Sequence, residues 1–389
     1  MFNHRIYRPR LENLSGSELN NEWKTWARSE EVNRFVPFTN SSYFYELTLL
    51  RAVLGLYIHD AAISTMFQHE ALLRSKGISL PIAADDDVFH APTATEWRDR
   101  MLLRTEQPPP IHKCMHINLP PHQYTKPLPQ ELSCKSSRLT AYVILCGILT
   151  SICEKQQMDQ LETGSTNFEK YFEALMCWYI TFQADQDKDS NQTDPLCLMI
   201  LWHTVFMNLL TNFNTLERAI GRDGSQTSSA ESDQLYATKW ASAIEAKRCI
   251  LHVHAIQNIL GTMRLDAEPA IHIPHCLFLA GIASFCYAQF GHTPAPAPNV
   301  NLEFSEFTLR GASIPQHLFN SSQSSADRRG SAQSNGTHNS GPVVPVGIVM
   351  LYMLTDMLQR IGHWGIARKL SGVLGALVQA DSDEVWLLR

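Results

Sequence analysis

Three consecutive aspartates, Asp85-Asp86-Asp87, are the residues whose type and spacing most resemble a catalytic site. Magnesium needs several oxygen ligands on one face, and prenyl-diphosphate enzymes supply them as Asp-Asp-x-x-Asp/Glu on a helix. Here Phe89 and His90 stand where the third carboxylate would be, and no second acidic motif follows. The alternative is a solvated turn that caps the next helix, because aspartate is a preferred N-cap residue. We favour the cap.

A second cluster has the ligand types of a zinc site. His112-x-Cys114-x-His116 is followed by His122 and Cys134. Structural zinc sites favour C-x₂₋₄-C and H-x₃₋₅-H spacings, which this stretch lacks. The surrounding prolines are typical of an exposed loop. We therefore favour scattered polar residues over a metal site.

Other histidines are better explained as core or capping residues. His272, His275 and Cys276 stand at the start of an apolar helix with no paired ligand set elsewhere. His252 and His254 are two residues apart, so on a helix they point to different faces and do not chelate one ion.

Familiar catalytic motifs are absent from the sequence. It contains no G-x-x-x-x-G-K-[ST], no G-x-G-x-x-G, no G-x-S-x-G and no H-E-x-x-H. We therefore predict that this chain is not an enzyme and that it holds no catalytic residue, cofactor or metal ligand of its own.

Composition excludes several classes of protein. The 389 residues are 44% apolar and 18% charged, which is typical of a globular chain. The net charge of -6 and the lack of a basic stripe argue against unaided nucleic-acid binding. Nine dispersed cysteines without C-x-x-C predict reduced thiols in the cytosol or nucleus. The N-terminus has no apolar segment typical of a secretory signal.

Helical periodicity predicts an all-α fold, an irregular multi-helix bundle. Leu198, Leu201, Trp202 and Val205 recur at three- and four-residue steps, and similar patterns extend along the chain. Short alternating runs of β-branched residues are lacking. The predicted helices cover residues 17–34, 45–74, 94–104, 137–153, 168–184, 194–221, 232–261, 274–290, 346–361 and 364–379.

Linkers divide these helices. Residues 106–130 are rich in proline, and residues 291–345 end in a Ser/Gly/Asn/Gln tract that cannot bury enough apolar surface to order itself. We expect a short linker over residues 1–16, one large helical domain over 17–290, a largely disordered linker over 291–345, and C-terminal helices over 346–389 that pack back on the domain. The most apolar stretch, 271–290, contains His272, Pro274 and His275, so we expect a core helix and no contact with a membrane.

An ordered series of short motifs resembles the regulatory region of fungal-specific transcription factors, also called the middle homology or xylanolytic activator regulatory domain. The resemblance covers residues 17–290 and the final helices. Its motifs are Trp23-x-x-Trp26-x-x-x-Glu30 with Asn33-Arg34, then Leu54-Gly55-Leu56-Tyr57-Ile58-His59-Asp60, Leu80-Pro81, Phe89-His90-Ala91-Pro92-Thr93-Ala94, Glu96-Trp97, Leu201-Trp202-His203 and Ala246-Lys247-Arg248.

The resemblance implies a nuclear protein that regulates transcription by RNA polymerase II and binds transcriptional co-regulators. Some members of this family dimerise or respond to small molecules. The resemblance therefore also implies a second copy of the chain and a small-molecule effector as partners. DNA and zinc belong to an N-terminal module that this chain lacks, since it has neither a two-Cys two-His finger nor a six-cysteine cluster. The tryptophans at 23, 26, 97 and 202 are expected to be packing anchors.

One segment departs from the family pattern. Residues 35–50 separate Arg34 from Arg51, and we expect this aromatic stretch to be either a retained intron or a true insertion. Whether the gene model is truncated is a separate question that the sequence leaves open. Arg34 and Arg51 are expected to pair with Glu30 or Glu46. Two other functions stay open: an all-α enzyme such as a prenyl-diphosphate enzyme, and a helical scaffold without a role in transcription.

Overall fold

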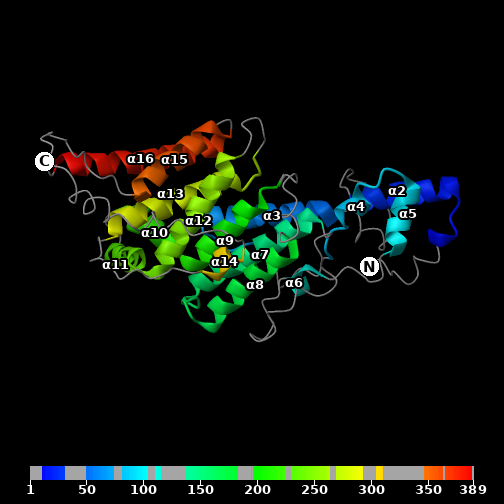
Figure 1. Ribbon diagram of the computed structural model, residues 1–389, viewed down its shortest axis with the longest axis horizontal. Helices are drawn as coiled ribbons and strands as arrows, with labels where there is room; N and C mark the ends of the chain where they lie inside the picture. Colours follow the sequence, from blue (N-terminus) through cyan, green and yellow to red (C-terminus); the bar gives the residue numbers. More distant parts are fainter. Residues whose placement is uncertain are drawn as a thin grey trace, which may run out of the picture. The chain divides into compact units, whose positions relative to one another are not determined.

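The computed structural model is all-α, which confirms the fold class predicted from helical periodicity. The described part of the chain contains no β-strand, only an isolated bridge between Pro81 and Pro110. The described residues are 11–30, 50–73, 81–103, 110–114, 137–182, 194, 196–224, 229–262, 269–291, 304–309, 346–361 and 364–387. The chain divides into two compact units, residues 1–198 and 199–389, so the boundary falls at the start of α9 (Figure 1).

The first unit is built on one buried helix. Its helices are α2 (Gly16–Glu30), α3 (Leu50–Met66), α4 (Asp86–Phe89), α5 (Ala94–Leu103), α6 (Ile111–Cys114), α7 (Arg138–Gln157) and α8 (Thr166–Phe182). Every residue of α7 from Thr140 to Ile152 is buried, and α3, α6 and α8 pack against it. Such a helix is apolar all round, because it has no face in water.

A smaller core in the first unit joins α2, α4 and α5. Its buried residues are Leu11, Leu19, Trp26, Ala84, Val88, Ala91, Trp97 and Met101, and Trp23 packs against them. The rings of Trp26 and Trp97 lie 5.5 Å apart between centroids. These two side chains are therefore packing anchors, as the sequence predicts.

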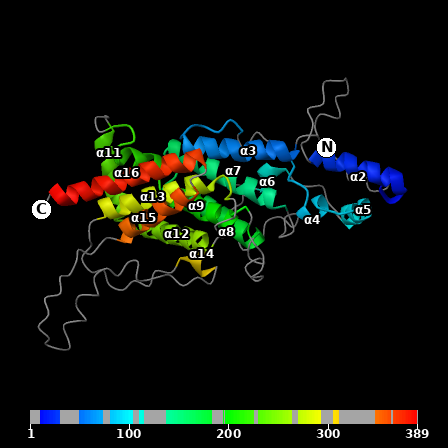
Figure 2. The ribbon, with the colours of Figure 1, turned by 90° about the horizontal axis from the view of Figure 1, so that it is seen from above.

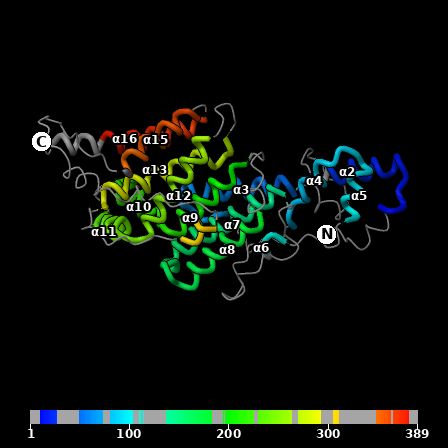
Figure 3. The backbone as a smooth tube through the Cα atoms, in the orientation of Figure 1, coloured from blue at the N-terminus to red at the C-terminus, as the bar shows by residue number. Residues whose placement is uncertain are grey.

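The second unit is centred on α13. Its helices are α9 (Leu198–Leu210), α10 (Phe213–Ala219), α11 (Ala230–Ala241), α12 (Ile244–Gly261), α13 (Ile273–Phe290), α14 (Ser305–Thr308), α15 (Val346–Arg360) and α16 (Gly365–Leu387). Helices α12, α13 and α15 lie side by side (Figures 2 and 3). Helix α13 is long and apolar enough to cross a membrane, but 72% of it is buried within the protein.

The C-terminal helices approach α13 very closely, and glycine makes this approach feasible. A Cβ at Gly347 in α15 would lie 2.5 Å from the backbone oxygen of Ser284 in α13. A Cβ at Gly281 in α13 would lie 2.5 Å from Cδ1 of Leu374 in α16. Helices α15 and α16 therefore lie against α13 within the second unit.

Two stretches that the sequence predicts as single helices are each divided. Residues 194–221 form α9 and α10, because the side chain of Asn212 accepts a hydrogen bond from the backbone of Thr215 and caps a new helix. Residues 232–261 form α11 and α12, with the break at Ser242 and Ala243. Periodicity continues through both breaks, while asparagine and serine bond locally to the backbone.

A third predicted helix is shorter than expected. The stretch 45–74 has its helix over Leu50–Met66, after which Gln68 has a left-handed backbone with a φ of 55°. Residues 35–49 of the expected insertion lie outside the described residues, as do residues 1–10 of the expected N-terminal linker and most of the stretch 291–345.

Candidate functional site

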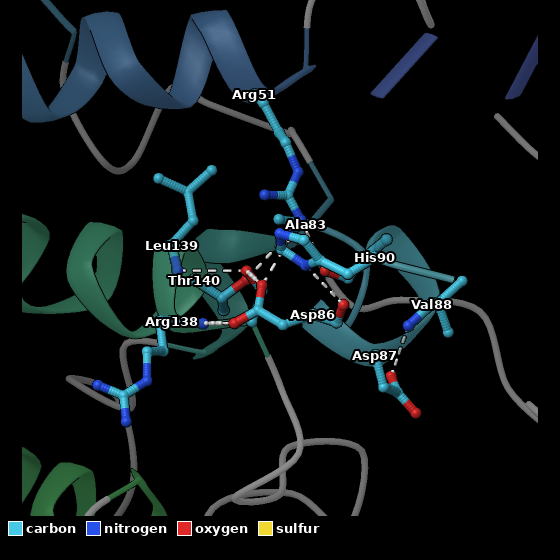
Figure 4. A network of polar contacts seen from close by, with 11 residues as sticks. Arg51, Ala83, Asp86, Asp87, Val88, His90, Arg138, Leu139 and Thr140 are labelled. Atoms are coloured by element: carbon cyan, nitrogen blue, oxygen red, sulfur yellow. Dashed lines mark hydrogen bonds and ion pairs between the residues drawn. The ribbon is translucent and has the colours of Figure 1, made fainter. Parts of the chain in front are cut away.

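The aspartate cluster contributes to a network at the start of α7, which we name the α7 cap network: Arg51, Asp86, Ser137 and Arg138 (Figure 4). The carboxylate of Asp86 accepts hydrogen bonds from the hydroxyl of Ser137 at 2.8 Å and from the backbone N–H of Arg138 at 3.0 Å. The hydroxyl of Ser137 accepts from the backbone of Leu139. Asp86 therefore satisfies an N-terminal donor of α7, where the helix dipole favours negative charge.

Arg51 adds a positive charge to the α7 cap network. One guanidinium nitrogen lies 3.7 Å from Asp86 and donates to the carbonyl of Ala84 at 3.2 Å. The guanidinium also lies 3.6 Å from the centre of the Phe89 ring. The partners that the sequence predicts for Arg51 are Glu30 and Glu46, and their side chains lie outside the described residues.

The sequence predicts that the aspartates cap the next helix. An aspartate does cap a helix, but the helix is α7 and not the next one in the chain. Asp85 holds the N-cap position of α4 but makes no capping hydrogen bond there. Asp86 caps α7, which begins 52 residues later in the chain. The carboxylate of Asp87 accepts from the backbone of Val88 and points away from that of Asp86 (Figure 4). The carboxylates of Asp86 and Asp87 thus do not converge on one face, as a magnesium site would need.

The histidine–cysteine stretch is only partly described. Cys114 is buried in α6, and its thiol donates to the carbonyl of Pro110. His116, His122, Cys134 and the side chain of His112 lie outside the described residues. Elsewhere in the described part, no group of three His, Cys, Asp or Glu side chains is placed to hold a metal ion.

The second unit contains a buried polar cluster that the sequence did not indicate, which we name the Glu306 network: His203, Arg248, His252 and Glu306. One carboxylate oxygen of Glu306 accepts from Nε of Arg248 at 3.0 Å and lies 2.9 Å from Nη2 of the same guanidinium. That oxygen lies 3.8 Å from Nε2 of His252. The Nδ1 atoms of His203 and His252 are 2.8 Å apart, so one of them donates to the other.

Burial makes the Glu306 network electrostatically strong. Glu306, His203 and His252 have no exposed surface, and the side chain of Arg248 is 14% exposed. A paired charge in such a site interacts more strongly than in water, and an unsatisfied one is more costly. The second carboxylate oxygen of Glu306 makes no hydrogen bond among the described residues.

Aromatic rings enclose the Glu306 network. The ring of His252 is stacked on Phe206 with centroids 4.9 Å apart, and Phe307 lies 4.8 Å away on α14. Phe304 lies under the guanidinium of Arg248 at 5.0 Å. The enclosed surface of α9 and α12 can therefore recognise a carboxylate next to an aromatic side chain.

The histidines singled out in the sequence lie in different environments in the structure. His252 is buried and its ring meets His203, while His254 is half-buried, in agreement with their different faces. His272 is buried at the N-cap position of α13 without a capping hydrogen bond from its side chain. Burial lowers the pKa of His275 to about 4, which keeps its ring neutral at physiological pH.

Cys153 and Cys249 have thiols that burial holds in the protonated form. Burial raises the pKa of Cys153 and of Cys249 to about 12. A nucleophilic thiol needs the opposite shift, because the thiolate is the reactive form.

Sequence reasoning missed Glu306 because it lies in the predicted linker. The described residues 304–309 form a helical turn in which Glu306 and Phe307 are buried. The available signal was an apolar island, Phe304-x-Glu306-Phe307, next to a Ser/Gly/Asn-rich tract. In the sequence, Arg248 stands out only as part of the Ala246-Lys247-Arg248 motif.

Comparison of the chain with known protein families, with curated proteins and with solved structures gave no match. The resemblance to the fungal regulatory region thus stays a prediction from sequence motifs, and the residues that carry it can now be located in the structure.

Proposed function

We propose that this chain is the helical regulatory part of a nuclear transcription regulator and acts by binding other proteins. The observation that carries the proposal is the contact between Trp26 and Trp97, which belong to motifs 71 positions apart in the sequence. Ala91 comes from a third motif of the same series and is buried in the same core. Motifs that succeed one another in the sequence therefore contribute to one structural unit.

Exposed apolar side chains support a role in protein binding. Val349, Tyr352 and Met353 on α15 are each about half exposed. Larger apolar patches on a protein surface often mark sites of contact with other macromolecules. Co-regulators, a second copy of the chain and a small-molecule effector are the partners that the resemblance implies.

The test is a reporter assay. The chain is fused to a heterologous DNA-binding domain, and transcription is measured from a promoter that carries the matching sites. We expect reporter output to change relative to the DNA-binding domain alone, and the chain without the fusion to accumulate in the nucleus.

Two variants of α5 make the assay specific. Trp97→Ala removes a ring that has no exposed surface and should abolish the effect, whereas Leu103→Ala alters a side chain 81% exposed on the same helix and should keep it. Unchanged reporter output with an abundant nuclear fusion would refute the proposal. Magnesium-dependent turnover of prenyl diphosphates by the purified chain would instead support the enzyme alternative.

A further inference from the structure

We propose that the surface formed by α9 and α12 around Arg248, His252 and Phe206 is a binding site for a short peptide in which glutamate precedes an aromatic residue. In this structure the site is occupied by the chain's own residues 304–309, which we name the 304–309 segment. The inference does not depend on a role in transcription.

The backbone of the 304–309 segment is bonded within itself. The amides of Phe307 and Thr308 both donate to the carbonyl of Phe304, and that of Leu309 donates to Ser305. The segment therefore forms its own helical turn, and its contacts with α9 and α12 come from side chains. A peptide ligand that binds as a helical turn also makes its contacts through side chains. Figures 1 and 2 both show α14 beside α12.

Two adjacent side chains anchor the segment. Glu306 is fully buried against Arg248, and Phe307 is buried against the ring of His252. Ser305, Thr308 and Leu309 are exposed. The segment thus presents one buried pair to the site, with Phe304 under the guanidinium as a partly buried third contact. This division between buried anchors and exposed neighbours is typical of peptide recognition.

The chemistry of the anchor favours recognition over core packing. A buried ion pair adds little stability relative to apolar residues of the same shape, because both charges lose their hydration. The pair here also leaves the second carboxylate oxygen of Glu306 without a hydrogen bond among the described residues. A carboxylate fixed by a guanidinium does, however, distinguish glutamate from an apolar side chain of the same size.

The histidine pair positions the ring that meets Phe307. When Nδ1–H of His203 donates to Nδ1 of His252, the proton of His252 is on Nε2, the nitrogen that faces Glu306. This tautomer adds a partial positive charge to the carboxylate site. In that tautomer the site offers the full positive charge of Arg248 and the partial positive charge of the His252 N–H, enclosed by aromatic rings.

The experiment is peptide exchange on the folded full chain. Protease sites are introduced in residues 292–300 and 311–320, the purified protein is cut after folding, and a fluorescent peptide of residues 300–313 is added. We expect the labelled peptide to replace the excised one, with fluorescence anisotropy rising while circular dichroism stays unchanged. A second chain, in which the 304–309 segment is replaced by Gly/Ser of equal length, should bind the same peptide without cutting.

Matched peptides give the specificity. Glu306→Gln in the peptide should weaken binding at least about tenfold, since a hydrogen bond to a charged group is replaced by a neutral one. Thr308→Ala, at an exposed position, should bind like the natural peptide. With Arg248→Met in the chain, the preference should disappear and reverse toward the Gln peptide, because the Glu carboxylate would then be buried without its partner.

Several results would overturn the inference. The first is that the excised segment does not exchange while the protein stays folded. The second is that the labelled peptide binds without preference for Glu306. The third is that both the cut chain and the Gly/Ser chain unfold. The last of these would make the segment an integral part of the core.

Discussion

The α7 cap network and the Glu306 network both place a carboxylate beside an arginine, yet their surroundings differ. Asp86 is 38% exposed on its side chain and has two hydrogen-bond donors besides Arg51. Glu306 has no exposed surface and relies chiefly on Arg248. The first carboxylate can lose its arginine and remain satisfied, whereas the second cannot. The exposure of each carboxylate and the number of its hydrogen-bond donors, more than the ion pair itself, thus decide how far its arginine matters for stability.

The largest effect is expected for Arg248→Met, which leaves a carboxylate in an apolar site. Removal of one partner of a buried pair costs about 3 kcal/mol or more. The 304–309 segment should then leave its site, and hydrogen exchange at the amides of Thr308 and Leu309 should accelerate about a hundredfold, since 1.4 kcal/mol corresponds to about a factor of ten.

The control for that prediction is the double variant Arg248→Met/Glu306→Met. It should recover most of the lost protection, because no charge remains buried. If the double variant is as unprotected as the single one, the buried charge is not the cause.

A pH effect is expected in the second unit. Between about pH 6.5 and 4, the unfolded chain binds a proton at His275 that the folded chain excludes, because burial lowers the pKa of His275 to about 4. Stability therefore falls as pH falls through this window and levels off below it. One pKa unit is worth about 1.4 kcal/mol, and the half-buried ring retains some hydration, so we expect a loss of about 2 kcal/mol.

The measurement for His275 compares the natural chain with His275→Gln. Burial also raises the pKa of Glu217 in the same unit, which acts with the opposite sign, so only the difference between the two chains isolates His275. The measured quantity is the protection of the α13 amides, which is the exchange rate corrected for intrinsic exchange. As pH rises, this protection should increase less in the variant than in the natural chain. Identical stability profiles for the two chains would contradict the prediction.

A smaller loss is expected for Asp86→Ala in the first unit. Loss of a capping carboxylate costs about 1 kcal/mol, so the free energy of unfolding of this unit should fall by that amount in urea. Asp85→Ala is the matched control, since Asp85 makes no capping hydrogen bond to its helix. Equal losses in the two variants would mean that the bond to α7 has no special value.

The smallest effect is expected for Arg51→Met. The guanidinium contacts Phe89, donates to the carbonyl of Ala84 and forms a long ion pair with Asp86. These partly exposed contacts together should stabilise the first unit by less than about 1 kcal/mol. A loss close to that of Arg248→Met, measured in the same denaturant series, would remove the distinction between the two networks.

The sequence predicted the elements of this protein better than its polar sites. Apolar periodicity located the long helices, because burial of an apolar face is the main source of helix stability in a folded protein. It failed at Asn212, whose side chain caps a new helix, and at Ser242 and Ala243, where α11 ends and α12 begins although the apolar pattern continues.

The two networks escaped sequence reasoning for a different reason. Asp86 and α7 are 52 positions apart, and Arg248 and Glu306 are 58 positions apart. A single sequence carries no signal for such pairing, because each partner alone is compatible with a solvated surface. The polar composition of residues 291–345 predicts a largely disordered linker. It gives no sign that Glu306 and Phe307, within this stretch, are buried.

The glycine contacts of α13 have a consequence for shortened forms of the protein. A protein truncated before residue 346 would lack α15 and α16. The surface of α13 around Gly281 and Ser284 would then be exposed to solvent. An uncovered apolar helix of this length is a substrate for chaperones and for proteolytic quality control. We therefore expect the second unit to depend on its final two helices for stability.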